Sequence, residues 1–221
     1  MEIKIVKNIL AANETIAQEN KNLFQKNNVF VINIMSAPGA GKTSLIEKTI
    51  EKLKNRYRIA VIEGDIATSL DAEKLSKYGI PVTQINTEPF GGDCHLDANM
   101  IKNALTSLDL SEIDLLLIEN IGNLVCPAEF YLGENKKVML LSVTEGEDKP
   151  LKYPLMFRLA NLLVVSKTDL LEQAGTNLDK LKKSVLQVNP TLKSIFLSVK
   201  TGQGMEQWYT WLTEVIQPYR I

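Results

Sequence analysis

The chain has 221 residues, 45% of them hydrophobic, which is enough for one α/β domain and too few for two of ordinary size. Its 25 Lys and Arg residues balance 26 Asp and Glu residues, so there is no basic excess to bind a nucleic acid or an anionic membrane. Apolar runs stay well below the roughly 18 residues of a membrane span and no signal peptide is recognisable, so we expect a cytoplasmic protein.

Helices and strands are expected to alternate along most of the chain. Apolar positions spread through residues 3–25 predict an amphipathic helix, which makes residues 1–28 a leading helical segment of a single domain spanning 1–221. Short apolar runs predict strands at 29–35, 57–63, 80–85, 113–119, 137–143, 162–166 and 194–198. Amphipathic stretches predict helices at 44–53, 72–78, 96–108, 177–187 and 204–216. Pro81 argues for an edge strand or a strand start.

This alternation predicts an α/β fold of the P-loop NTPase type. Its doubly wound, mostly parallel sheet would carry helices on both faces. In such sheets the ligand sits beyond the carboxyl ends of the strands. The functional residues are therefore expected in the loops that leave those ends.

The run Ser36-Ala-Pro-Gly-Ala-Gly-Lys-Thr43 lies between an apolar strand and an amphipathic helix, as a phosphate-binding loop does. Its backbone N–H groups and the helix N-terminus would hold phosphates, Lys42 would reach the β- and γ-phosphates, and Thr43 would bind Mg²⁺. Ser36 stands where the usual pattern begins with Gly. The alternative is a glycine-rich turn without a ligand. The expected phosphate-binding residues are Pro38, Gly39, Ala40, Gly41, Lys42, Thr43 and Ser44.

Two later loops, Ser166-Lys-Thr-Asp169 and Ser198-Val-Lys-Thr-Gly202, are similar to the base-recognition loops of GTPases. Asp169 would accept hydrogen bonds from N1–H and the 2-amino group of guanine, which adenine lacks. Lys167 would pack along the base, and Ser198, Val199 and Lys200 would border the guanine oxygen. Ser166 replaces the usual Asn, so nucleotide affinity is expected to be modest. The alternative for Lys167–Asp169 is an exposed charged turn.

Two carboxylates follow predicted strands at the P-loop edge. Asp65 and Glu119 are expected to serve catalysis with Lys42, one binding Mg²⁺ and the other ordering a water at the γ-phosphate. Asp65 has a second interpretation as a cap of the following helix. Gly122 would let residues 119–126 move as a switch segment. No glutamine or arginine finger is evident in these loops, so slow hydrolysis is expected.

The chain has two cysteines and one histidine, and Cys94 and His95 are adjacent in a loop of glycine and acidic residues. Thiolate and imidazole suit Zn²⁺ or Ni²⁺. Cys126 lies seven residues after Glu119, so a moving switch would carry a potential ligand with it. Three residues leave a tetrahedral site incomplete, and two copies across a two-fold axis would supply six. The alternative is that the cysteines are ordinary buried residues.

Together, the P-loop, Glu63-Gly-Asp-Ile-Ala-Thr-Ser-Leu-Asp-Ala72, Cys94-His-Leu-Asp97, Glu119-Asn-Ile-Gly-Asn-Leu-Val-Cys-Pro127 and Ser166–Asp169 resemble the HypB family. These GTPases help to deliver nickel to [NiFe] hydrogenases during maturation. The resemblance implies GTP and Mg²⁺ as ligands and a nucleotide-gated homodimer. It also implies Ni²⁺ or Zn²⁺ on Cys94, His95 and Cys126 at the subunit interface, and Thr43 and Asp65 on Mg²⁺.

The implied partners are a hydrogenase large-subunit precursor and an accessory nickel metallochaperone. With one histidine, the chain lacks the histidine-rich tract of some family members, so nickel storage is not expected. Three alternatives remain open: a urease-type nickel-maturation GTPase, a scaffold whose assembly is controlled by nucleotide, and a small-molecule kinase with a structural Cys/His cluster.

Overall fold

A seven-stranded parallel sheet forms the centre of the structure, in the strand order β3-β2-β4-β1-β5-β6-β7. The computed structural model describes residues 2–66, 68–88 and 94–220. All six neighbouring pairs of strands are parallel, as expected from the alternation of strands and helices. The strands are β1 (Phe30–Ser36), β2 (Ile59–Asp65), β3 (Val82–Asn86), β4 (Leu115–Glu119), β5 (Lys136–Ser142), β6 (Leu162–Ser166) and β7 (Ser194–Phe196).

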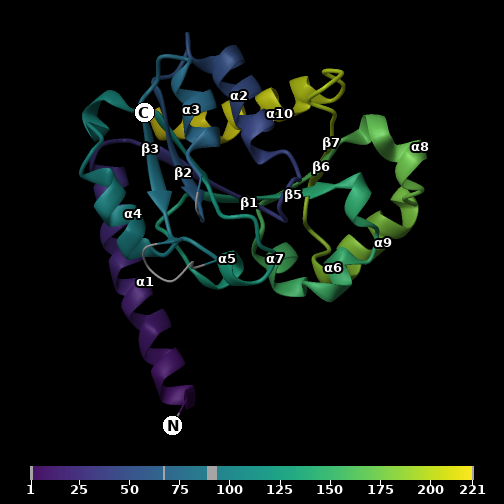
Figure 1. The fold of residues 1–221 in the computed structure, drawn as a ribbon, viewed down its shortest axis with the longest axis horizontal. Helices are drawn as coiled ribbons and strands as arrows, with labels where there is room; N and C mark the ends of the chain where they lie inside the picture. Colours follow the sequence, from purple (N-terminus) through teal and green to yellow (C-terminus); the bar gives the residue numbers. More distant parts are fainter. Residues whose placement is uncertain (1, 67, 89–93, 221) are drawn as a thin grey trace.

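Helices cover both faces of the sheet, which confirms the doubly wound α/β prediction (Figure 1). The α-helices are α1 (Glu2–Lys26), α2 (Lys42–Leu53), α3 (Leu70–Ser76), α4 (Ala98–Leu105), α5 (Cys126–Glu129), α6 (Lys149–Lys152), α7 (Pro154–Leu159), α8 (Leu171–Ala174), α9 (Leu178–Val188) and α10 (Met205–Ile216). Short 3-10 turns are η2 (Leu110–Glu112), η3 (Val143–Glu145), η4 (Thr168–Leu170) and η5 (Gln217–Arg220).

The core is divided by the sheet because successive strand residues point to opposite faces. On one face, alternate residues of β1 and β4 pack against α2 and α10, with Trp208 fully buried. The other face packs against α1 and α4 around Phe24, and against α7 and α9 around Phe157. Burial on both faces explains why the central strands are continuous apolar runs rather than alternating ones.

The leading helix α1 is attached to the sheet domain by one stripe of buried residues, Asn13, Ala17, Asn20 and Phe24. Within this stripe, Asn20 donates hydrogen bonds to the carbonyl oxygens of Ala98 (2.8 Å) and Leu132 (3.2 Å). Asn13 accepts from the amide of Ala98 at 2.8 Å. The helix therefore covers one side of the sheet, as expected, and also holds the start of α4.

The starts of two helices differ from the sequence-based expectation in a way that affects the carboxyl edge of the sheet. The helix expected at 96–108 is α4, which begins at Ala98 because Asp97 caps it by accepting a hydrogen bond from the Met100 amide at 2.7 Å. The helix expected at 72–78 is α3, which begins earlier, at Leu70. The earlier start places Asp71 in the first turn of α3. Pro81 directly precedes β3, which is an edge strand as predicted.

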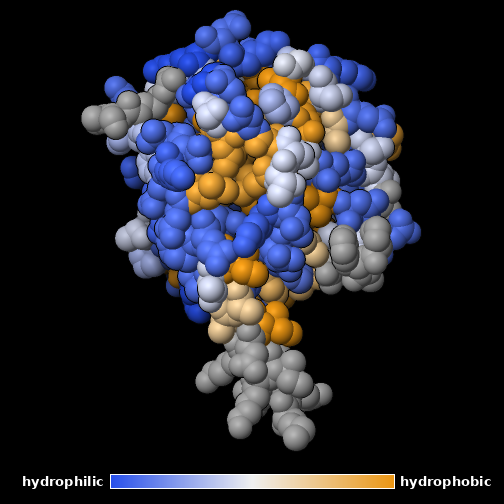
Figure 2. Space-filling model, turned by 90° about the vertical axis from the view of Figure 1, so that its left-hand side faces the viewer, coloured by the Kyte–Doolittle hydropathy of each residue, from blue (hydrophilic) through white to orange (hydrophobic). Residues whose placement is uncertain are grey.

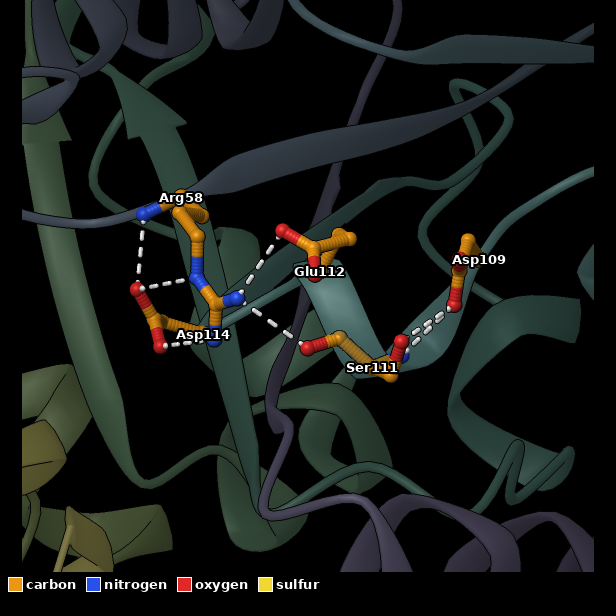
Figure 3. A network of polar contacts seen from close by, with 5 residues as sticks. All are labelled: Arg58, Asp109, Ser111, Glu112 and Asp114. Carbon is orange, nitrogen blue, oxygen red and sulfur yellow. Dashed lines mark hydrogen bonds and ion pairs between the residues drawn. The ribbon is translucent and has the colours of Figure 1, made fainter.

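The amino ends of β2 and β4 are joined by a polar cluster around Arg58 (Figure 3). The Arg58 guanidinium donates to both carboxylate oxygens of Asp114, at 3.0 and 3.3 Å, and to Glu112 at 3.2 Å. Asp109 accepts hydrogen bonds from the amide and hydroxyl of Ser111 in the adjoining turn. This cluster aligns the two strands at the end opposite to their carboxyl edge.

From the side that carries α1, α4 and β3, the surface is mostly hydrophilic, with an apolar region near its centre (Figure 2). None of the helices in the described part of the chain combines the length and the apolar character needed to cross a bilayer.

We predict that Asn20→Ala lowers the free energy of unfolding by about 1–3 kcal/mol, because it removes two buried hydrogen bonds to the carbonyl oxygens of Ala98 and Leu132. Asn22 lies on the exposed side of the same helix and accepts from Gln18, so Asn22→Ala is a matched control with an effect within about 0.5 kcal/mol. Urea denaturation of both variants provides the comparison. Equal stability of the two variants would contradict the anchoring role of Asn20.

Candidate functional site

The loop between β1 and α2 has the backbone shape that a phosphate cradle needs. Gly39 and Gly41 adopt positive φ angles of 73° and 102°, a conformation that other residues rarely adopt. Gly41 is the N-cap of α2, and no side chain caps this end of the helix. The first amides of α2 are therefore available to an anion at the carboxyl edge of the sheet.

Lys42 is buried at the start of α2, and its ammonium group donates to the Ser36 hydroxyl at 3.1 Å. Burial lowers the pKa of Lys42, while the carboxylates of Glu119 and Asp71 oppose the shift. Ser36 donates in turn to the Ala37 carbonyl at 2.6 Å. Ser36, which departs from the usual glycine, thus provides the hydroxyl that holds Lys42 in this structure.

The Thr43 hydroxyl lies between two carboxylates, 2.9 Å from Glu119 Oε1 and 3.0 Å from Asp71 Oδ2. Burial raises the pKa of Glu119 to about 7, against the opposing effect of Lys42. Asp71 was not identified from the sequence. Its position six residues after Asp65, inside the same motif, was the available signal, but its contact with Thr43 depends on where α3 begins.

Asp65 ends β2 and uses its carboxylate in the turn that follows. It accepts from the Ile66 amide at 2.7 Å and from the Thr68 amide and hydroxyl. The alternative that Asp65 caps the next helix is wrong, because the N-cap position of α3 is Ser69. Asp65 instead fixes the loop between β2 and α3 and faces the P-loop.

Two cavities lie on either side of the P-loop. The first, of about 240 Å³, carries the carboxylates and Lys42. It is lined by Pro38, Gly39, Lys42, Glu63, Gly64, Asp65, Ile66, Asp71, Glu119, Asn120, Ile121 and Gly122. The second, of about 330 Å³, brings both predicted base-recognition loops to the P-loop. It is lined by Ala40, Gly41, Ser44, Leu45, Leu140, Ser166, Lys167, Asp169, Leu170, Leu197, Val199 and Lys200.

The base-recognition loops are attached to the P-loop by hydrogen bonds to its carbonyl oxygens. Ser166 donates to Ala40 at 2.7 Å, and Lys167, which has a positive φ of 57°, donates to Gly39 at 2.7 Å. Asp169 accepts from the Ser198 hydroxyl at 2.6 Å, which joins the two loops to each other. Lys167–Asp169 is therefore a structured part of the second cavity rather than an isolated charged turn.

Cys94, His95 and Cys126 lie together, with one ligand atom of each within 4.8 Å of the others. The two sulfur atoms are 3.0 Å apart and both cysteines are free. The neighbouring Cys94 thiol and burial raise the pKa of Cys126. The His95 ring stacks on Phe130 at a centroid distance of 3.9 Å. Two sulfurs and an imidazole fit Zn²⁺ or Ni²⁺ as a donor set. The preceding glycine-rich residues 91–93 lie outside the described chain.

Residues 119–126 connect this cluster to the P-loop. Asn123 donates to the Cys94 carbonyl at 3.2 Å, and Asn120 accepts from the Leu96 amide at 3.2 Å. A Cβ added to Gly122 would lie 2.8 Å from Pro38 Cα. The sequence had suggested that Gly122 gives this segment freedom to move. In the structure, a glycine fits at position 122 because the P-loop backbone approaches too closely to leave room for a side chain.

The buried carboxylates of the first cavity should make the stability of the folded protein depend on pH. Burial, with a contribution from Glu119, raises the pKa of Glu63 from 4.5 to about 8, and burial raises that of Glu119 to about 7. Between pH 4.5 and these values the folded protein binds more protons than the unfolded chain, so its stability falls as the pH rises. Urea denaturation without metal or nucleotide should show this decline, and Glu63→Gln should make it shallower. A stability that increases over the interval would contradict the assignment.

The chain is similar to a known protein family and to several of its members. Residues 30–196 match the family described as CobW/HypB/UreG, nucleotide-binding domain. A hydrogenase maturation factor HypB from Rhizobium leguminosarum is 49% identical over 210 residues, which cover 95% of this chain and 69% of the relative.

Two crystal structures have the same fold. HypB from Archaeoglobus fulgidus gives a TM-score of 0.86 at 42% identity, with coverage of 93% of this chain and 99% of that one. HypB from Helicobacter pylori in complex with nickel gives a TM-score of 0.87 at 37% identity, with coverage of 94% and 96%. Both structures match along nearly the whole of this chain.

Proposed function

The chain belongs to the HypB family of hydrogenase maturation factors, within the CobW/HypB/UreG nucleotide-binding proteins, and we propose on this basis that it is a GTP-hydrolysing metallochaperone for [NiFe] hydrogenase. The observation that carries the proposal is the direct connection of two sites. A nucleotide-sized pair of cavities around the P-loop is joined through residues 119–126 to a cluster of two thiols and one imidazole.

Guanine would occupy the second cavity. Asp169 would accept from N1–H and the 2-amino group, while Ser198 holds the carboxylate in place and Lys167 lies along the base. Val199 and Lys200 line the same cavity and would border the guanine oxygen. Ser44 would lie under the nucleotide at the start of α2. An adenine base has no donors at these positions, so Asp169 would keep only the Ser198 hydroxyl and gain no hydrogen bond from the base.

The triphosphate would lie along Pro38 to Thr43, with Lys42 moving from Ser36 to the β- and γ-phosphates. Thr43 and Asp65, with Glu119 and Asp71 close by, form an oxygen donor set that suits Mg²⁺. When bound, Mg²⁺ would neutralise charge on the phosphates. Glu119 would orient the attacking water. Neither cavity is lined by an arginine or glutamine among the described residues, which supports slow intrinsic turnover.

Nickel or zinc would bind to Cys94, His95 and Cys126 at the interface of a homodimer. One chain brings three donors together, one fewer than a tetrahedral site needs, whereas two chains supply six. Because Asn123 bonds to Cys94 and Gly122 contacts Pro38, a change in the P-loop on nucleotide exchange would reach the thiols. Nucleotide and metal binding would then be coupled in both directions.

In the cell, the metal would pass to a hydrogenase large-subunit precursor. An accessory nickel metallochaperone would be the second protein partner. We place this single-domain protein in the cytoplasm. We expect neither nucleic acid nor membrane as a partner, because its Lys and Arg residues do not outnumber its Asp and Glu residues. The nickel complex of the Helicobacter pylori relative supports nickel as the metal.

We predict that Asp169→Asn weakens GDP binding roughly 100-fold, because two hydrogen bonds to a charged acceptor are lost. Titration with fluorescent GDP and ADP would measure the change, and ADP should bind poorly to the unmodified protein. Asp179→Asn, on the exposed side of α9, removes the same charge outside both cavities and should retain GDP affinity. Equal binding of GDP and ADP would instead favour the kinase alternative.

An anaerobic Ni²⁺ titration tests the metal site. Thiolate-to-nickel absorption should differ between the GDP complex and the complex with a non-hydrolysable GTP analogue, because residues 119–126 contact both sites. The absorption should disappear in Cys94→Ala and Cys126→Ala while GDP affinity is retained. Absence of the band in both nucleotide states would contradict nickel delivery and leave a GTPase that acts through assembly.

A further inference from the structure

Glu63 occupies a position in the sheet that the nucleotide-binding motifs do not include. On the face covered by α2, the β2 row Ile59, Val61, Glu63 runs beside the β4 row Leu115, Leu117, Glu119. Register pairs Glu63 directly with Glu119. Each row is apolar until its carboxyl end, where a carboxylate replaces the aliphatic side chain and lies next to the start of α2.

Both carboxylates are buried, with Glu63 2% and Glu119 4% exposed. Within the described part of the chain, neither Glu63 Oε2 nor Glu119 Oε2 has a hydrogen-bond partner. Both residues line the cavity that also holds Lys42 and the P-loop glycine Gly39. A buried carboxylate oxygen without a partner is destabilising, so these two atoms indicate a ligand that belongs between them and the P-loop.

The charge around the cavity identifies the class of ligand. Four carboxylates, Glu63, Asp65, Asp71 and Glu119, face it, and Lys42 is the one cationic side chain among the residues that line it. Carboxylate oxygens at this density select a hard divalent cation such as Mg²⁺ or Mn²⁺. A neutral water would satisfy the hydrogen-bonding capacity of the oxygens but not their charge.

We propose that Glu63 is a positioning carboxylate for the divalent cation of the nucleotide site, acting with its register partner Glu119. The inference rests on the proposed GTP and Mg²⁺ function and adds a residue to it. Glu63 would hold the cation directly or through a water.

The test measures metal and nucleotide binding separately. Mn²⁺ affinity of the GDP complex is determined by electron paramagnetic resonance, and GDP affinity in EDTA by fluorescence, for the unmodified protein and Glu63→Gln. Mn²⁺ prefers oxygen ligands, so the thiolate cluster does not interfere. We expect Mn²⁺ affinity to fall about tenfold or more. Metal-free GDP affinity should stay the same, because glutamine matches the protonated carboxyl group in size.

Glu112→Gln is the charge-matched control, since this exposed residue pairs with Arg58 at the opposite end of the sheet. Unchanged Mn²⁺ affinity in Glu63→Gln would overturn the proposal. Equal losses of Mn²⁺ and metal-free GDP affinity would also overturn it, because they would mean that Glu63 only shapes the P-loop. If the unmodified GDP complex bound no Mn²⁺, the nucleotide function would fail together with this inference.

Discussion

The parallel direction of all seven strands is the constraint on which the site depends. Because the carboxyl ends of parallel strands share one edge, β1, β2, β4 and β6 deliver the P-loop, Asp65, Glu119 and Ser166 to the same region. Aliphatic packing on both faces fixes the strand register and therefore the spacing of these groups. Groups that are more than 100 positions apart in the chain meet here, as the Ser166 hydroxyl and the Ala40 carbonyl do at 2.7 Å.

Several features of the site were predictable because they depend on local conformation or strand ends. Gly39 and Gly41 signal a backbone that needs positive φ, and apolar runs that end in Asp65 and Glu119 predict carboxylates at the edge. Other features depend on contacts between distant elements. Asp71 reaches Thr43 only because α3 begins at Leu70, and a pattern of apolar residues does not fix a helix start so closely.

Ser36 and Ser166, which depart from the usual motifs, also make contacts that the sequence did not predict. From the sequence, Ser166 was expected to weaken nucleotide binding because it is shorter than asparagine. In the structure its hydroxyl still reaches the P-loop, while Ser36 supplies an acceptor for Lys42 that glycine would lack. The hydrogen-bonding partner of a short hydroxyl side chain is set by backbone proximity across the sheet, which residue identity alone does not reveal.

A buried chain of amides runs behind the site, from Asn120 to Asn33 at 3.2 Å and from Asn33 to Glu134 at 3.4 Å. Glu134 also accepts from the Leu132 amide and lies 3.6 Å from the Lys137 ammonium. Buried polar groups of this kind are costly when a partner is lost, so the chain holds residue 120 in one arrangement. It gives the segment between the thiols and the P-loop a rigid support.

The edge strand β3 has a consequence for how copies of this protein associate. It has five residues, pairs with a neighbour on one side only, and follows Pro81, which has no amide hydrogen to offer an incoming strand. The Thr83 hydroxyl is already paired with that of Ser107. A short, proline-flanked edge is a poor template for sheet extension, so at β3 copies of the chain are directed away from strand pairing and towards contacts between side-chain surfaces.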